Sequence, residues 1–393
     1  MEGNLIHPVL NDSLYIAQGI DYLPCITSFR IFRPDRQIAY VPFCDDFGPM
    51  SMSSVVKFIV QLDKELADHP HCRLFYMVEH GVRSLTNAIF LLGSYLMLAH
   101  GASVDDVDDT FSWLEDDQFE EYRDATFSDP GFRLTLADCW RALDKGRLLG
   151  WIARPTANGF CGVLDMLEYA NYENPLNGDL HEVVPDKLIA FVGPHDLGGD
   201  SYRDDARGLR RFSPAFFADL FADRGVAAVV RLNERSYDES AFAQRGIAFL
   251  DLPFGDCTPP PPHVAAAFLA AVAASPGPVA VHCKAGLGRT GTLIALHLMR
   301  SHAFSAREAV GWLRVMRPGS VIGEQQAYLC AMERAGLCRP DVPVTAAAAA
   351  AAAALTDGVN PARSTARAAE AAEAAAAEVW AACERRGAER ARA

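Results

Sequence analysis

The sequence predicts an α/β protein with two domains, the second of which favours a mostly parallel sheet covered by helices on both faces. Three observations support this fold class. The chain has 393 residues and is 50% hydrophobic, which is enough for more than one core. Apolar segments of strand length alternate with amphipathic segments of helical length. The alternation stops near residue 155 and restarts near residue 187, after an acidic segment.

The first half combines one clear strand with several helices, a pattern typical of a small α/β domain. In chain order we expect short strand-like pieces in 1–35, a Ser-capped helix in 45–66, the buried strand RLFYMV at 73–78, and helices in 84–100, 101–117 and 134–151.

The second half alternates more regularly. We expect strands at 187–194, 226–232, 247–253 and 279–283, and helices at 213–225, 261–274, 292–300, 306–317 and 323–336. The first of these helices starts at Ser-Pro and stops at a glycine. The composition then changes: residues 341–393 contain nine consecutive alanines and read as a low-complexity, partly helical tail.

Charge and cysteine content restrict the partners and the compartment. The net charge of −14 argues against nucleic acid and anionic membrane as partners and is compatible with basic substrates. The longest apolar stretch, 88–99, is too short to span a bilayer. Ten cysteines without a CxxC pair, and no signal-peptide pattern in residues 1–10, predict a reducing nucleus or cytoplasm.

The segment HCKAGLGRTG, which follows the apolar strand Val279-Ala280-Val281, predicts the chemistry. Cys283 stands between a strand and a helix, and glycines in the loop allow backbone N–H groups to turn inward as an anion cradle. That field favours the thiolate, and Arg289 offers a planar fork for two phosphate oxygens. The phosphate-binding residues expected around them are Lys284, Ala285, Gly286, Leu287, Gly288 and Thr290.

This arrangement suits a phosphate ester that is attacked by thiolate to give a phosphocysteine intermediate. Thr290 can donate its hydroxyl to the sulfur when the cysteine becomes the leaving group. Protonation of the ester oxygen needs an acid on a loop, and Asp256 in DLPFGDCTPP is preferred over Asp251, which reads as a capping or buried carboxylate. Gln325 and Gln326 could orient the water that hydrolyses the intermediate; the alternative is an ordinary polar helix start.

Several segments together resemble the cell-division-cycle-fourteen dual-specificity phosphatases over about residues 10–337. In the second half these are HCKAGLGRTGTLIA, DLPFGDCTP, RPGSVIGEQQ, YENPLNGDL and PDKLIAFVGPH. In the first half they are YVPFCDDFGPMSM, NAIFLLGSYL and YRDATFSDPGFRLTLADCWRAL.

The resemblance implies two tandem phosphatase-like domains, only the second of them catalytic. The implied parts are a non-catalytic domain (1–157), an acidic linker (158–183), a catalytic domain (184–340) and the tail (341–393). EHGVRSLTNA follows the first domain's strand and has no cysteine, as an inactive domain would. Carried over by motif, Cys283 is the nucleophile, Arg289 the phosphate binder and Asp256 the general acid, without metal or organic cofactor.

The resemblance also implies phosphoserine-proline substrates with basic residues nearby, selected by the acidic linker, and opposition to proline-directed kinases in the cell cycle. It leaves association with the nucleolus, centrosome or spindle open. Glu173 fits an acidic substrate-binding position, whereas Ala170 replaces an expected carboxylate that Glu168 or Asp165 could supply. Cys257 replaces a family glycine, which could stiffen the loop or allow a disulfide with Cys283 under oxidation.

Two other functions stay open at this point. A phosphoinositide phosphatase would share the loop but typically has a second basic residue where Leu287 stands. A catalytically inactive phosphoprotein-binding module would usually lack the cysteine, the arginine or the acid, and all three are present. Turnover of a protein substrate separates these alternatives.

Overall fold

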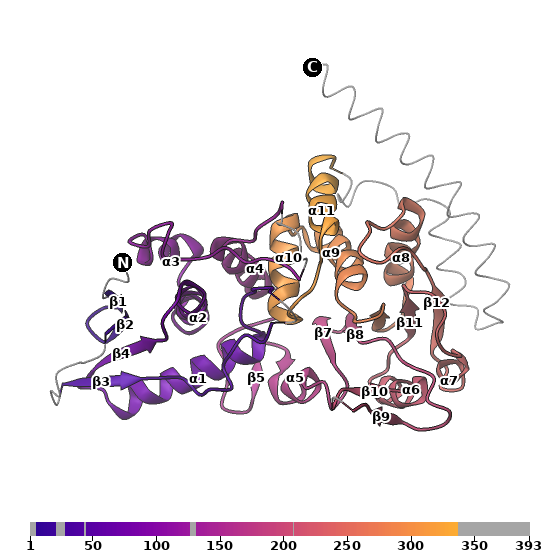
Figure 1. Ribbon diagram of the computed structural model, residues 1–393, viewed down its shortest axis with the longest axis horizontal. Helices are drawn as coiled ribbons and strands as arrows, with labels where there is room; N and C mark the ends of the chain where they lie inside the picture. The colour runs from indigo at the N-terminus through magenta and orange to yellow at the C-terminus, as the bar shows by residue number, and fades with distance from the viewer. Residues whose placement is uncertain (1–4, 21–27, 43–44, 126–130, 207, 337–393) are drawn as a thin grey trace, which may run out of the picture. The chain divides into compact units, whose positions relative to one another are not determined.

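The computed structural model describes residues 5–20, 28–42, 45–125, 131–206 and 208–336. The chain divides into unit 1, Met1–Leu167, and unit 2, Glu168–Ala393 (Figure 1). Both units combine a partly parallel sheet with helices, so the predicted α/β class is confirmed. The division falls within the segment predicted as a linker, although the four-part domain scheme stays a prediction. The predicted tail at 341–393 lies outside the described residues.

Unit 1 has a four-stranded sheet in the order β1-β2-β4-β3, in which β4 pairs in parallel with both of its neighbours and β1 is antiparallel to β2. Its elements are β1 (Leu5–Leu10), β2 (Leu14–Gln18), β3 (Phe29–Phe32), α1 (Met52–Asp68), β4 (Arg73–Val78), α2 (Val82–His100), α3 (Val104–Thr110), α4 (Leu136–Leu148), β5 (Phe160–Cys161) and β6 (Leu164–Asp165).

The helix predicted over 101–117 is too long. A capping box between Ser103 and Asp106 starts α3, but the helix ends at Thr110. Phe111 then enters the core and stacks on Trp140 with ring centroids 5.9 Å apart. The acidic run that follows therefore continues as turns, because tertiary burial of an aromatic ring outweighs helical propensity.

Helix α2 is the core helix of unit 1. By length and composition alone it could cross a membrane, yet 78% of its most apolar window is buried inside the protein. Gly93 lets it approach α4, since a Cβ at this position would lie 2.5 Å from the Trp140 ring. Its apolar character on all sides therefore fits a buried helix of a packed domain.

Unit 2 has a five-stranded sheet in the order β12-β11-β13-β8-β7. Three neighbouring pairs are parallel, and β7 is an antiparallel edge strand. The elements are α5 (Met166–Glu173), which begins just before the division, β7 (Leu180–Val184), β8 (Leu188–Phe191), β9 (Tyr202–Asp204), β10 (Arg210–Phe212), α6 (Pro214–Asp223), β11 (Ala228–Arg231), α7 (Ser240–Ala243), β12 (Ala248–Asp251), α8 (Pro262–Ala274), β13 (Val279–His282), α9 (Gly288–His302), α10 (Ala306–Met316) and α11 (Glu324–Arg334).

The sheet of unit 2 has an aromatic-rich face. Side chains from its strands pack with α6 and α7 in one cluster that includes Phe191, Phe217, Phe221 and Phe242. Helix α9 contacts α8, α10 and α11. The four strands β8, β11, β12 and β13 run in parallel, so their carboxyl ends meet at one edge of the sheet (Figure 1). Ligand sites of open α/β sheets occur at this edge.

Buried histidines make the stability of unit 2 depend on pH. Burial lowers the pKa of His297 in α9 to about 3, with smaller effects from His302 and Lys187. The unfolded chain takes up a proton at this side chain near its ordinary value of 6.5, whereas the folded chain does not. Stability therefore falls as the pH falls from 6.5 towards 3.

We predict that His297→Gln removes part of this slope. The free energy of unfolding of the variant should lose about 1 kcal/mol less per pH unit than that of the unsubstituted chain between about pH 6.5 and about pH 4.5. Urea unfolding at several pH values measures it. Parallel slopes for the two proteins would contradict the assignment of a neutral, buried His297.

Candidate active site

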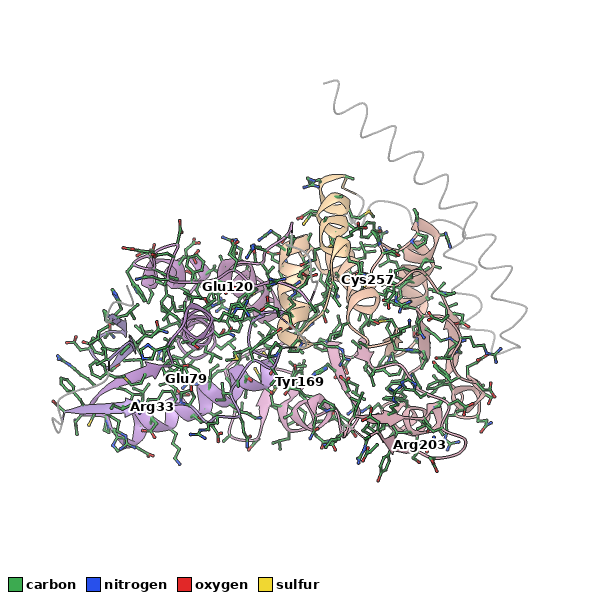
Figure 2. All side chains as sticks on the ribbon, viewed as in Figure 1. Arg33, Glu79, Glu120, Tyr169, Arg203 and Cys257 are labelled. Atoms are coloured by element: carbon green, nitrogen blue, oxygen red, sulfur yellow. The ribbon has the colours of Figure 1, made fainter. Side chains whose placement is uncertain are left out.

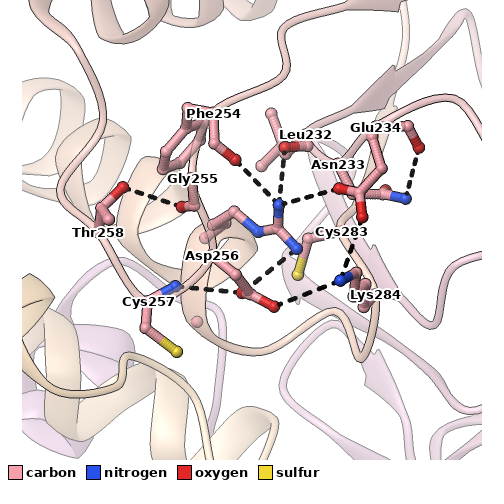
Figure 3. A network of polar contacts seen from close by, with 12 residues as sticks. Leu232, Asn233, Glu234, Phe254, Gly255, Asp256, Cys257, Thr258, Cys283 and Lys284 are labelled. Atoms are coloured by element: carbon pink, nitrogen blue, oxygen red, sulfur yellow. Dashed lines mark hydrogen bonds and ion pairs between the residues drawn. The ribbon is translucent and has the colours of Figure 1, made fainter.

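Three loops meet at the carboxyl edge of the unit 2 sheet. The thiol loop, residues 283–288, follows β13 and carries Cys283, of which 3% is exposed. The acid loop, residues 252–260, follows β12 and carries Asp256. A third loop after β11 carries Glu234. Figure 3 shows side chains from all three around the guanidinium of Arg289. Strand order thus brings together residues that are separated by up to 55 positions, from Glu234 to Arg289.

The thiol loop needs glycine at two close approaches. Gly286 has a φ of +69°, and a Cβ there would lie 2.0 Å from the carbonyl oxygen of Phe191. Gly193, which follows β8, packs against the loop backbone. Its N–H donates to Lys284 O at 2.8 Å, and a Cβ at this position would lie 2.3 Å from Cys283 O. Both positions therefore exclude side chains.

The buried guanidinium of Arg317 holds the back of the thiol loop. Its Nη2 donates to Ala285 O and its Nε to Gly286 O, each at 2.9 Å. Its Nη1 pairs with Asp179 at 2.9 Å and lies 2.9 Å from His181 Nδ1. A trans peptide places each N–H opposite the preceding C=O, so the amides that follow these carbonyls point away from Arg317. This is the orientation that an anion cradle requires.

Helix α9 begins at Gly288, four residues before the predicted start. The two glycines of GRTG predict a loop, but the N–H of Gly291 donates to Leu287 O at 2.9 Å and closes the first helical turn. Gly288, Arg289 and Thr290 are therefore helical, and the positive end of the helix dipole faces the thiol loop. The hydroxyl of Thr290 is buried and has no hydrogen-bond partner among the described residues. Its predicted donation to the sulfur stays a prediction.

His282 stabilises the thiol loop as a neutral ring. Burial lowers the pKa of His282 to about 3. Its Nδ1 lies 2.8 Å from Cys283 O, which can only accept, so we assign the proton to Nδ1. Nε2 then accepts from the Tyr237 hydroxyl at 2.6 Å. His282 therefore fixes the backbone next to the thiol and carries no positive charge at neutral pH.

Arg289 is held in a way that leaves one edge of its guanidinium for an anion. It is 1% exposed, and its Nη1 donates to Phe254 O at 3.0 Å and to Leu232 O at 3.3 Å. Nε and Nη2 are buried and have no hydrogen-bond partner among the described residues. Nη2 forms an ion pair with Asp256, whose Oδ1 lies 3.2 Å away. Nε and Nη2 form an edge of the kind that binds two oxygens of a phosphate.

The two acid candidates have different environments. Asp251 accepts from Nε and Nη2 of the fully buried Arg231, at 2.6 and 2.5 Å. Asp256 is half-exposed, close to Arg289, and lies 3.9 Å from Lys284 Nζ. The structure therefore assigns Asp251 to a structural ion pair and brings Asp256 to the phosphate-binding groups.

Gln325 and Gln326 also differ. Gln325 Nε2 donates to Thr258 O in the acid loop at 3.1 Å, and its Oε1 is 3.0 Å from the place of a Cβ on Gly288. It therefore lies between the two loops. Gln326 accepts from Arg314 at 2.7 Å and donates to Gly323 O at 3.2 Å. Both ends of its amide are thus used at a distance from the acid loop. The Oε1 of Gln325 also accepts from Ile322 N at 3.1 Å, so its contact with the acid loop is what distinguishes Gln325 from Gln326.

The acid loop has an unusual residue at Cys257. It adopts φ +58°, the left-handed region in which glycine is the usual residue. Its N–H donates to Asp256 Oδ1 at 3.1 Å, and its side chain is exposed (Figure 2). Neither Cys257 nor Cys283 is in a disulfide in this structure, so the disulfide stays a prediction.

Contacts within the chain distinguish the acidic residues of the predicted linker. Glu173 ends this helix and is half-buried. Glu168, which could have replaced the carboxylate missing at Ala170, forms an ion pair with Arg224. Asp165 Oδ1 accepts from Leu167 N at 2.9 Å. Both compensating carboxylates therefore have partners within the chain. The substrate-binding role of Glu173 stays a prediction.

Sequence reasoning missed Glu234 and Arg317. Arg317 lies in RPGSVIGEQQ, a segment quoted for its resemblance without a role for this side chain. Glu234 follows the carboxyl end of β11, a position at which parallel sheets place functional side chains. The position of Glu234 at the carboxyl edge of a parallel sheet could have identified it from the sequence. The role of Arg317 depends on a contact with carbonyls 31 and 32 positions away.

Unit 1 has no thiol at the corresponding place. After β4 the chain reads Glu79-His80-Gly81 and enters α2 directly. Arg83 lies in the first turn of α2, and its Nε and Nη2 donate to the two carboxylate oxygens of Glu120 at 2.9 Å. A side chain of the protein thus occupies the arginine edge that Arg289 leaves for an anion in unit 2.

The fold and the site together are typical of cysteine-dependent phosphatases with a dual-specificity type of domain. Two family models match the chain. "Dual specificity protein phosphatase, N-terminal half" covers residues 9–146, and "Dual specificity phosphatase, catalytic domain" covers residues 259–335. The second includes the thiol loop and Gln325, and the acid loop only in part.

Known relatives narrow the class to a family. The dual specificity protein phosphatase CDC14C of Symphalangus syndactylus is 34% identical over 81% of this chain and 64% of its own. The tyrosine-protein phosphatases cdc-14 of Caenorhabditis elegans (36%, 76% of this chain) and CDC14 of Saccharomyces cerevisiae (33%, 81% of this chain) match over 42% and 57% of their own lengths. The chain belongs to the CDC14 family of dual specificity phosphatases, and it spans less than two thirds of the length of these three relatives.

We predict that Arg317→Gln lowers kcat/KM by about 100-fold, because two loop carbonyls lose their donor and the cradle shifts. Phosphate release from an aryl phosphate measures it. Arg314→Gln is the matched control, since Arg314 is also a buried arginine and donates to Ser320 O, Val321 O and Gln326. Both variants should unfold at a lower temperature. Equal losses of activity would contradict a specific role for Arg317.

Proposed function

We propose that the chain hydrolyses phosphoserine, phosphothreonine and phosphotyrosine in proteins through a phosphocysteine intermediate. The observation that carries the proposal is the half-used guanidinium of Arg289. It is buried next to the thiol loop, its Nη1 is bound by backbone carbonyls, and its Nε–Nη2 edge has no hydrogen-bond partner among the described residues. Such an edge fits a phosphate dianion, and the nucleophile and an acid come from the adjoining loops.

In the first step the thiolate of Cys283 attacks phosphorus. The S–P bond forms as the bond to the ester oxygen breaks, and Asp256 gives its proton to that oxygen. Arg289 and the inward amides of the loop hold the equatorial oxygens in the transition state. In the second step Asp256 takes a proton from water, whose oxygen attacks phosphorus. The S–P bond breaks, phosphate leaves and the thiolate is restored.

The arriving phosphate itself prepares the acid. Asp256 and the substrate compete for Arg289, because Asp256 Oδ1 lies 3.2 Å from the Nη2 that a phosphate oxygen needs. When phosphate takes this edge, Asp256 loses a cationic partner and gains a dianionic neighbour. Both changes favour the protonated form, which is the form that the first step requires. Gln325, which lies between the acid loop and Gly288, is the residue we assign to positioning the attacking water.

For the substrate we propose phosphoserine-proline sites with basic residues nearby, and opposition to proline-directed kinases in cell-cycle control. The proposal is supported by the CDC14 family membership and by the net charge of −14. Glu173 is the candidate contact for a basic residue. Ala170 and the ion pair of Glu168 with Arg224 make selection for basic residues weaker than two free carboxylates would.

We predict that Cys283→Ser binds a phosphopeptide without releasing phosphate, because the hydroxyl is a poor nucleophile at neutral pH. Calorimetric binding together with a phosphate-release assay measures this. Release of phosphate by the variant at a rate near that of the unsubstituted chain would contradict the thiol as the nucleophile.

We predict that Asp256→Ala lowers kcat on a phosphoserine peptide by about 100- to 1000-fold and on an aryl phosphate by much less, since only the alkoxide needs a proton to leave. Asp251→Asn is the control for a nearby carboxylate. It should lower the unfolding temperature, because it disrupts the pair with buried Arg231. It should not discriminate between the two substrates. Equal losses on both by Asp256→Ala would contradict its role as the acid.

A matched set of substrates tests the specificity. It contains a phosphoserine-Pro peptide with a following lysine, the same peptide with alanine for proline, a phosphotyrosine peptide and a soluble phosphoinositide headgroup. We expect kcat/KM to be highest for the first peptide. A preference for the headgroup would support the alternative lipid substrate instead, and binding without turnover would support a phosphoprotein-binding module.

A further inference from the structure

Two carboxylates and two cations form one cluster at the entrance to the thiol loop. The charge cluster consists of Glu234, Asp256, Lys284 and Arg289 (Figure 3). Three of these residues belong to the proposed chemistry. Glu234 has no role in it, yet it lies 3.1 Å from Lys284 Nζ and 3.9 Å from Arg289 Nη1.

We propose that Glu234 is a positioning residue for the proposed reaction: it holds Lys284 away from Asp256 and adds negative charge beside it, so that Asp256 keeps its proton to higher pH. The same charge weakens binding of the phosphate dianion. The inference rests on the proposed function, because it concerns the acid of that reaction.

The distances show how Lys284 is shared. Its ammonium group lies 3.1 Å from Glu234 Oε1 and 3.9 Å from Asp256 Oδ2. Glu234 therefore has the closer contact, and Asp256 has only the weaker interaction. Lys284 is long and half-exposed, so nothing but its partners determines where its charge lies. Without the Glu234 carboxylate, Asp256 becomes the nearest anion for Lys284.

Glu234 carries a full charge at neutral pH. Hydrogen bonds from its own backbone N–H and then from Lys284 lower the pKa of the Glu234 carboxyl, and the charges of Lys284 and Arg289 add to this. Its side chain is exposed, so it costs the fold little to keep this anion at the rim of the site. A permanent anion close to a group that must be protonated favours the protonated form.

The charged and titratable groups around Asp256 come from three elements. The thiol loop contributes Lys284, the first turn of α9 contributes Arg289, and the loop after β11 contributes Glu234. On its own loop Asp256 accepts the N–H of Cys257. In the substrate complex the phosphate pairs with Arg289, and Glu234 pairs with Lys284. Each cation near Asp256 thus has another anion, which leaves Asp256 free to be protonated in the complex.

The test compares Glu234→Gln with the unsubstituted chain in single turnovers on a saturating phosphoserine peptide across pH. The substitution removes an anion near Asp256 and lets Lys284 move towards Asp256. Both effects shift the rate profile in the same direction. The basic limb of the rate profile should therefore move to lower pH by about half a unit to one unit. The Kd for inorganic phosphate should fall about threefold, because the site becomes less negative.

Three controls make the result specific. An aryl phosphate needs no proton on its leaving group, so its basic limb should not move. Asp238→Asn removes a carboxylate from the same loop that contacts Ser240 and Arg235 and not the charge cluster, and it should leave both readouts unchanged. In a Lys284→Met background, Glu234→Gln should move the limb less than in the unsubstituted chain, because the lysine that would approach Asp256 is gone.

Each outcome decides the matter. An unchanged basic limb and unchanged phosphate affinity in an active Glu234→Gln protein would overturn the inference and leave the proposed function standing. A shift of full size in the Lys284→Met background would overturn the role of Lys284. Absence of turnover by the unsubstituted chain would overturn the proposed function and the inference together.

Discussion

The site depends on the anchoring of one buried guanidinium. A buried arginine is costly unless its donors are satisfied, and here Phe254 O and Leu232 O satisfy only Nη1. These carbonyls leave the ends of two neighbouring strands, β12 and β11, so the sheet itself determines the direction of the Nε–Nη2 edge. An anion at this edge satisfies the remaining donors of Arg289, which is the physical basis of the proposed preference for a dianion.

A second constraint turns the thiol loop into a cradle. Arg317 donates hydrogen bonds to two loop carbonyls, and His282 donates to a third. Gly193 lies too close to the loop to carry a side chain. The backbone of the loop thus has its carbonyls bound on the outside, and its amides are directed to the opposite side. In unit 1 the same type of strand-to-helix turn is short, and Glu120 neutralises Arg83. The two halves therefore share a fold class, and they differ in whether the arginine remains open to a ligand.

Much of this could be predicted from residues close together in sequence. The alternation of strands and helices, the thiol loop and the preference for Asp256 over Asp251 all follow from local patterns. The mostly buried edge strand β7 was missed, as was the hairpin of β9 and β10, whose strands are short and polar. The start of α9 was misplaced because glycines resemble a loop. Glu234, Arg317 and the difference between Gln325 and Gln326 depend on contacts between distant segments, which no local pattern contains.

The central claim is that Cys283 takes the phosphoryl group. The most direct measurement is acid quenching of the protein within the first turnover of a phosphopeptide, followed by mass spectrometry of its proteolytic peptides. The account predicts a phosphoryl group on the peptide that contains Cys283, formed and lost at rates that match phosphate release. Turnover without a phosphorylated Cys283, or a phosphoryl group on another residue, would contradict the account.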